Sequence, residues 1–68
     1  MTCDDHLAIA KGLLLKSIAV IVGSNLADAK KVQAIRSALQ DLDQKLLAKD
    51  HEALVGKSAW LIHLAEKG

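Results

Sequence analysis

Apolar residues between Leu7 and Val22 recur with the spacing of a helix, but they fall on two sides of it. At 3.6 residues per turn, one side carries Ile9, Leu13 and Val20, and the nearly opposite side carries Leu7, Ala10, Leu14, Ile18 and Ile21. A helix at the surface of a monomer normally has one apolar stripe. The pattern therefore predicts a helix over residues 4–22 that lies between two layers, the second of which another copy of the chain can supply.

Residues that commonly cap helices lie at both ends of this first helix. Thr2 and Asp5 have the spacing of a capping box at its start. Gly23 suits the left-handed position that closes many helices, and Asn25 suits the N-cap of a following helix. Because the connection is short, the second helix is expected either to fold back as an antiparallel neighbour or to leave at a steep angle.

The second expected helix, over residues 25–48, has a narrower apolar stripe than the first. Its apolar positions follow in steps of three and four, as in a coiled-coil seam: Val32, Ile35, Leu39, Leu42 and Leu46. The remaining faces are polar. This helix is therefore expected at the outside of the fold, with the seam turned inward.

A third helix is expected over residues 51–67, after a shift in the phase of the pattern. Asp50 suits the N-cap of that helix. No glycine or proline enforces the break, so one continuous helix over residues 25–67 is an alternative, with Gly56 as its weakest point. Trp60 and Leu64 point away from the main apolar face of the third helix and form a second patch.

Length and composition narrow the fold further. The chain has 68 residues, 51% of them hydrophobic but only 1% aromatic, and it contains no proline. A domain this short buries only about 60% of the surface of its unfolded chain. The single cysteine, Cys3, rules out a disulfide within the chain, so oligomerisation is the remaining means of stabilisation.

These observations predict one all-α domain over residues 1–68. The expected architecture is an antiparallel helical hairpin plus a shorter third helix, paired by a two-fold axis into a homodimeric helical bundle. The expected dimer or partner interface consists of Ile9, Leu13 and Val20, joined by Trp60 and Leu64. Either a second copy or a different protein can cover this surface.

Residues with reactive side chains do not form a recognisable catalytic or metal-binding pattern. Cys3, Asp4, Asp5 and His6 are neighbours that His51 or His63 can in principle join, but the spacing matches no zinc site. A nucleophilic cysteine also needs a rigid setting and a positioned base. We therefore expect no enzymatic activity, no metal and no cofactor.

Neither a membrane span nor a secretion signal is expected. The apolar stretch of the first helix is too short to span a bilayer and contains Lys11 and Lys16. Its acidic start lacks the positive charge of a signal peptide, although Ala27-Asp28-Ala29 resembles a cleavage site. The sequence therefore predicts a cytoplasmic protein.

A weak helix-turn-helix pattern supports an alternative function in DNA binding. The positions that fit the motif are Ile18, Ala19, Val22, Gly23, Ala29 and Val32. Lys30, Lys31 and Gln33 would then lie on the recognition helix. Against this, the net charge is only +1, and DNA binding normally needs several contacts to phosphates.

The function expected from the sequence is that of a small non-enzymatic protein–protein interaction module, acting as a regulator, adaptor or inhibitor. Surplus apolar surface is typical of contact sites. A dimeric helix-turn-helix-like DNA-binding regulator and a structural oligomerisation module are the alternatives.

Overall fold

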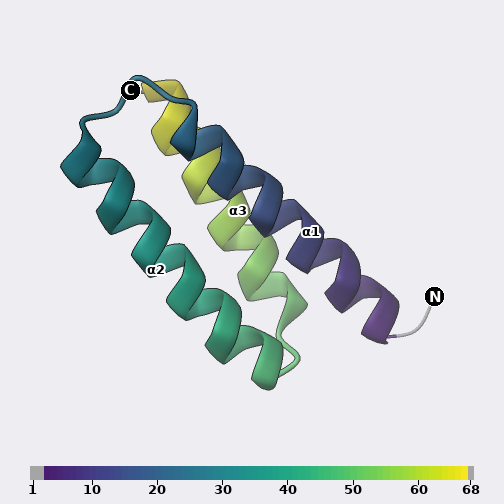
Figure 1. Cartoon of the computed structure of the whole chain (residues 1–68). Helices are drawn as coiled ribbons and strands as arrows, with labels where there is room; N and C mark the ends of the chain where they lie inside the picture. Colours follow the sequence, from purple (N-terminus) through teal and green to yellow (C-terminus); the bar gives the residue numbers. More distant parts are fainter. Residues whose placement is uncertain (1–2, 68) are drawn as a thin grey trace.

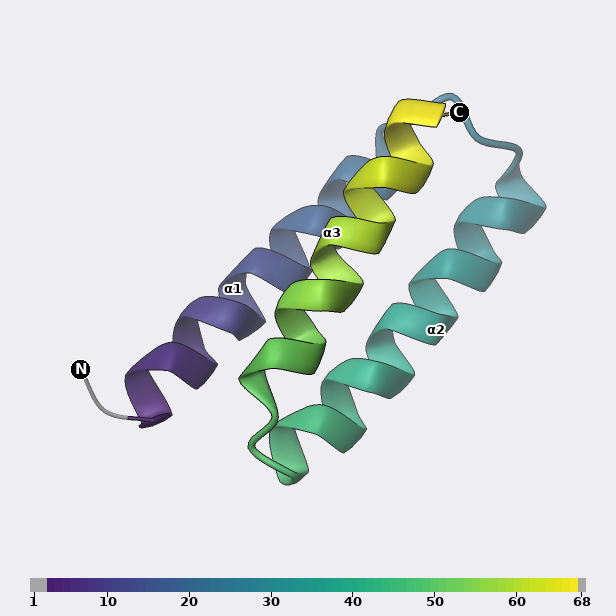
Figure 2. The same ribbon diagram turned by 180° about the vertical axis from the view of Figure 1, so that it is seen from behind.

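The computed structural model describes the backbone of residues 3–67 and the side chains of residues 4–67. Three helices make up this range: α1 (Cys3–Val22), α2 (Asp28–Leu47) and α3 (His51–Lys67). They form a three-helix bundle in which α2 runs antiparallel to α1, and α3 returns in the direction of α1 (Figures 1 and 2). The expected all-α class is confirmed. Thr2, half of the expected capping box, lies outside the described residues.

The first connection, residues 23–27, is longer than expected, so α2 begins at Asp28 instead of at residue 25. Leu26 is buried in the core at the end of the bundle, and this keeps the neighbouring residues out of the helix. The N-cap is therefore Ala27, which has no side-chain acceptor, and the assignment of Asn25 as the cap is wrong. The Ser24 hydroxyl donates a 2.6 Å hydrogen bond to the carbonyl of Ile21 and so stabilises the turn.

The second connection, residues 48–50, confirms the expected break and its cap. The Lys49 amide donates to the Leu46 carbonyl at 3.1 Å, and the Asp50 amide donates to the Lys45 carbonyl at 2.9 Å. This pair of hydrogen bonds is a Schellman motif. Asp50 Oδ1 then accepts a 3.1 Å hydrogen bond from the Ala53 amide, as an N-cap should. The alternative of one continuous helix is wrong.

Apolar side chains from all three helices and from the first connection fill the core: Ala10, Leu14, Ile21, Leu26, Ala34, Ala38, Leu54 and Leu61. α1 and α3 make the most extensive contact of the three helix pairs. Each contributes a buried serine, Ser17 and Ser58, whose hydroxyls donate 2.8 Å hydrogen bonds to carbonyls of their own helices. These small, satisfied side chains allow α1 and α3 to lie close together.

α2 presents a different face to the core from the one that the seam pattern predicts. Ala34 and Ala38 are its buried residues, whereas Val32 and Leu39 of the expected seam are exposed. Ile35, Leu42 and Leu46 pack at the edge of the core and are only partly buried. Leucines and isoleucine of α1 and α3 already fill the centre of the bundle, so α2 approaches it with its smallest side chains.

Within the range that the structure describes, none of the three helices combines the length and apolar character needed to cross a membrane.

Candidate interaction surfaces

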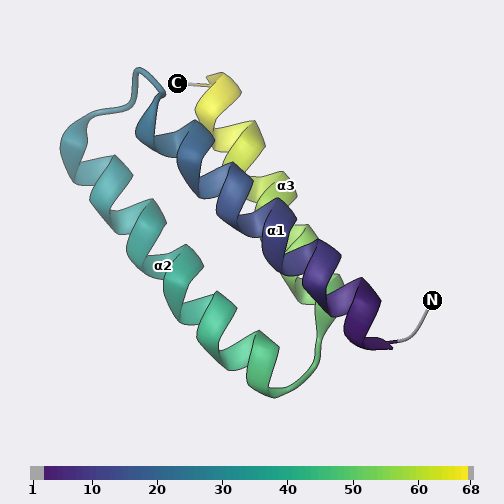
Figure 3. The same ribbon diagram turned by 45° about the vertical axis from the view of Figure 1, so that its right-hand side comes forward.

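A contact between two histidine rings shows which sides of α1 and α3 are neighbours. The ring centroids of His6 and His51 lie 5.4 Å apart, with the ring planes tilted by 54°. Both residues lie in the first turns of their helices, and the helices run in the same direction from this contact (Figure 3). Residues at helical spacing from either histidine therefore flank the same seam between α1 and α3.

Large aliphatic side chains are exposed along this seam. Leu13 and Val20 follow His6 by seven and fourteen residues, and Ile9 lies beside them on the same side of α1. On α3, Val55 and Ile62 follow His51 by four and eleven residues. Each of these side chains is at least a third exposed, and Ile9 is 59% exposed. We call this set the α1–α3 face: Ile9, Leu13, Val20, Val55 and Ile62.

The part of α1 that points into solvent beside this face is lined by small residues. Ala8, Gly12 and Ala19 are exposed and fall on one line at helical spacing. A Cβ atom added at Gly12 would meet nothing within 4 Å, so no part of the same chain approaches there. Leu15 and Val22, both exposed, border this line on its other side. The solvent side of α1 thus carries small residues between two rows of larger exposed aliphatic ones.

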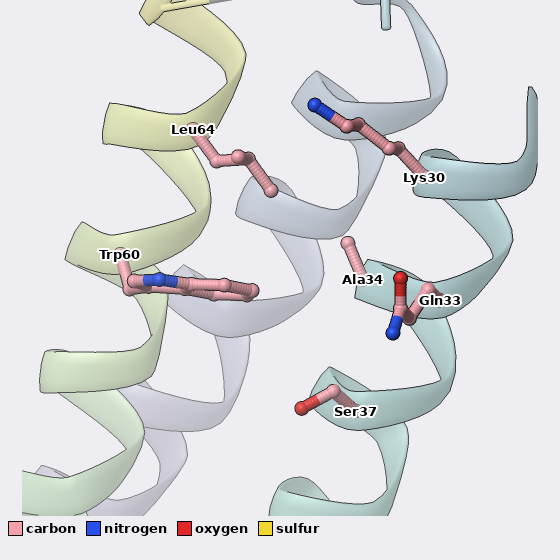
Figure 4. Close-up of a pocket in the computed structure, with 6 residues that line it drawn as sticks. All are labelled: Lys30, Gln33, Ala34, Ser37, Trp60 and Leu64. Carbon is pink, nitrogen blue, oxygen red and sulfur yellow. The ribbon is translucent and has the colours of Figure 1, made fainter. Parts of the chain in front are cut away.

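Trp60 and Leu64 lie away from the α1–α3 face, in a groove between α2 and α3 (Figure 4). The groove has a volume of about 340 Å³ and is lined by Lys30, Gln33, Ala34, Ser37, Trp60 and Leu64. The structure thus separates the expected interface residues into two surfaces. On α3, Val55 and Ile62 are the exposed aliphatic residues on the side of Leu13, and Trp60 and Leu64 are not.

One lysine bridges the two walls below this groove. The Lys57 ammonium lies 4.5 Å from the centroid of a Trp60 ring, 2.7 Å from Ser37 Oγ and 3.3 Å from Asp41 Oδ2. Its side chain is only 17% exposed, so it is shielded from solvent more than an ordinary surface ion pair. This contact joins α3 to α2 and fixes one face of the indole. The sequence pattern does not reveal the contacts to α2, because Ser37 and Asp41 lie far from Lys57 along the chain.

The three residues expected to contact DNA do not share one free surface. Lys30 and Gln33 line the α2–α3 groove. Lys31 Nζ instead donates a 3.0 Å hydrogen bond to the carbonyl of Val22, at the C-terminal end of α1. α1 and α2 lie antiparallel side by side (Figure 3), whereas the helices of a helix-turn-helix cross at about 90–120°.

The reactive side chains also remain scattered. His6 and His51 do meet, but among the side chains of residues 4–67 no group of three metal-ligating residues comes together. The side chain of Cys3 lies outside the described residues. His63 is exposed on α3. The described side chains thus form two candidate surfaces, the α1–α3 face and the α2–α3 groove, and no group of three metal-ligating residues.

Comparisons of the chain with protein-family models, with curated proteins and with solved structures return no match.

Proposed function

We propose that this protein is a small non-enzymatic interaction module that pairs with a second copy of itself through the α1–α3 face and thereby presents its other surfaces to a protein partner. The observation that carries this proposal is the row of exposed aliphatic side chains along α1 and α3. Contiguous apolar patches on small proteins are typical of contact sites.

A second copy is the occupant that suits the shape and the chemistry of this face. The five residues that define the face are all aliphatic, and a two-fold axis would place this surface against an identical one. Beside the face, the open space at Gly12 would let another chain approach α1 closely. Pairing of this kind creates a four-helix layer from two α1–α3 pairs, which is a common way of burying helix surface.

The size of the chain provides a further reason for pairing. A 68-residue bundle has a small core, and α1 alone exposes Ile9, Leu13, Leu15, Val20 and Val22. Burying such side chains contributes about 25 cal/mol per Å² of apolar surface removed from water. Dimerisation therefore adds stability that the core of one copy does not provide.

Light scattering across a wide dilution series tests the pairing. We expect the mass of a dimer for the unmodified protein and of a monomer for Leu13→Glu, because the substitution places a charge inside the apolar contact. Leu47→Glu is the matched control, since Leu47 is 90% exposed at the end of α2, and it should remain dimeric. Circular dichroism verifies that both variants are helical.

A monomeric unmodified protein at all concentrations contradicts the pairing proposal. Loss of the dimer in Leu47→Glu and not in Leu13→Glu contradicts the choice of face.

Binding to duplex DNA at two salt concentrations separates the interaction module from the alternative DNA-binding regulator. Affinity that depends on phosphate contacts falls steeply as salt increases. We expect little binding at either concentration, because Lys31 is engaged by Val22 and Lys30 lies at the groove. Tight, salt-sensitive binding that Lys30→Ala and Lys31→Ala abolish, with the fold intact, contradicts the proposal.

A further inference from the structure

The α2–α3 groove combines an apolar interior with a single charged lining residue. Trp60, Leu64 and Ala34 provide its apolar surface, and Lys30 carries the only formal charge among the six lining residues. In Figure 4 the indole of Trp60 extends from α3 toward α2, with Leu64 above it and Lys30 at the upper end of α2. Apolar walls with a few polar groups that fix orientation are typical of small-molecule sites.

Lys57 connects the two walls of the groove. The Lys57 ammonium contacts Trp60, Ser37 and Asp41, and so links the indole to α2. This contact favours the position of the indole that leaves the groove open. A ligand that binds to a preformed site loses less affinity to the entropy cost of ordering the side chains around it.

Charge complementarity indicates which kind of ligand the groove accepts. Asp41, the acidic residue nearest to the bridge, is already paired with Lys57. Lys30 has no such partner among the hydrogen bonds and ion pairs assigned within residues 4–67, and it borders the apolar interior. An anion beside Lys30 gains a charge-assisted hydrogen bond, whereas a cation there would be repelled.

We propose that the α2–α3 groove binds a small amphipathic carboxylate, with its apolar chain between Trp60 and Leu64 and its carboxylate at Lys30. A volume of about 340 Å³ admits a ligand of this size and lies at the lower end of the range for ligand sites. This activity goes beyond the proposed pairing, which uses the opposite side of α3.

Trp60 makes the proposal directly measurable, because it is the only tryptophan and the chain has no tyrosine. The experiment titrates the full chain with sodium octanoate, below its micelle concentration, and follows the emission of Trp60. The matched probe is 1-octanol, which has the same chain length and no charge. We expect a saturable change with octanoate and an affinity for octanol that is weaker by about tenfold.

Two substitutions on α2 test the role assigned to Lys30. Lys30→Met retains much of the apolar stem and removes the charge, so octanoate affinity should fall to that of octanol. Arg36→Met removes one positive charge at an exposed position outside the groove, and it should leave both affinities unchanged. Both variants leave the core untouched, and circular dichroism verifies their helical content.

The absence of a saturable change with octanoate overturns the proposal. Equal affinities for octanoate and octanol, or equal effects of the two substitutions, overturn the assignment of the carboxylate to Lys30. The titration is repeated with Leu13→Glu, which alters only the α1–α3 face. An unchanged octanoate affinity in that variant shows that binding in the groove does not depend on pairing.

Discussion

Lys49 has an unusual backbone conformation for its residue type. Its φ of 57° is the only positive φ of a non-glycine residue in the described part of the chain. This conformation lets the amides of Lys49 and Asp50 close the end of α2 in a Schellman motif. A side chain in the left-handed region costs about 1–2 kcal/mol. The turn therefore contains local strain that the capping hydrogen bonds offset.

Replacing Lys49 by glycine should relieve this strain. We expect Lys49→Gly to raise the free energy of unfolding by about 0.5–1 kcal/mol. The relief of the left-handed backbone strain should exceed the stability lost through the extra conformational entropy of glycine in the unfolded chain. Urea denaturation followed by circular dichroism measures the change. Asp50→Ala is the companion variant and should lower stability by about 1 kcal/mol through loss of the cap. A destabilised Lys49→Gly variant would contradict this account.

At the scale of elements, the orientation of α2 about its own axis decides which surfaces the bundle exposes. The helix turns Ala34 and Ala38 toward α1 and α3 and leaves Val32 and Leu39 in solvent. The same rotation places Lys30 and Ser37 beside Trp60 and so creates the groove. One choice of face therefore determines both the packing of α2 and the position of the candidate binding site.

Two adjacent positions on α2 test this orientation. Ala38→Leu should lower the free energy of unfolding by about 1–3 kcal/mol, because Ala38 is fully buried and the added side chain overpacks the core. Leu39→Gln should change it by no more than about 0.5 kcal/mol, because Leu39 is half exposed and glutamine has a similar helix propensity. Denaturant titrations of the two variants measure both effects. The reverse order would support the inward-facing seam.

At the scale of the whole molecule, the proposed pairing through the α1–α3 face would link stability to protein concentration. α1 contacts both other helices, and its remaining side carries aliphatic residues around the open position of Gly12. A second copy placed against the α1–α3 face would cover a further side of α1. The groove containing Trp60 lies on another side of α3 and stays accessible in such a dimer.

The melting temperature should therefore depend on concentration. For a dimer that unfolds to separate chains, an increase of about a hundredfold in concentration should raise the Tm by several degrees. Calorimetry over that range measures the shift. Leu13→Glu should abolish the dependence, and Leu47→Glu should retain it. A Tm of the unmodified protein that does not vary with concentration would contradict dimer formation.

The helices and their order could be predicted from the sequence because the signals for them are local. Apolar spacing defines α1, and Asp50 marks the start of α3 through contacts within one helical turn. The sequence also places Ile9, Leu13 and Val20 together on one side of α1, nearly opposite the side that packs in the core.

Only the tertiary structure decided which residues meet between helices. The volume of the side chains on α1 and α3 determines that α2 packs through Ala38 and not through Leu39, and the sequence of α2 alone does not contain this information. Likewise, Lys57 reaches Asp41 and Ser37 only because α2 and α3 fold side by side. Local hydrogen bonds and spacing thus determine the elements, whereas complementary volumes and charges from distant parts of the chain determine the surfaces.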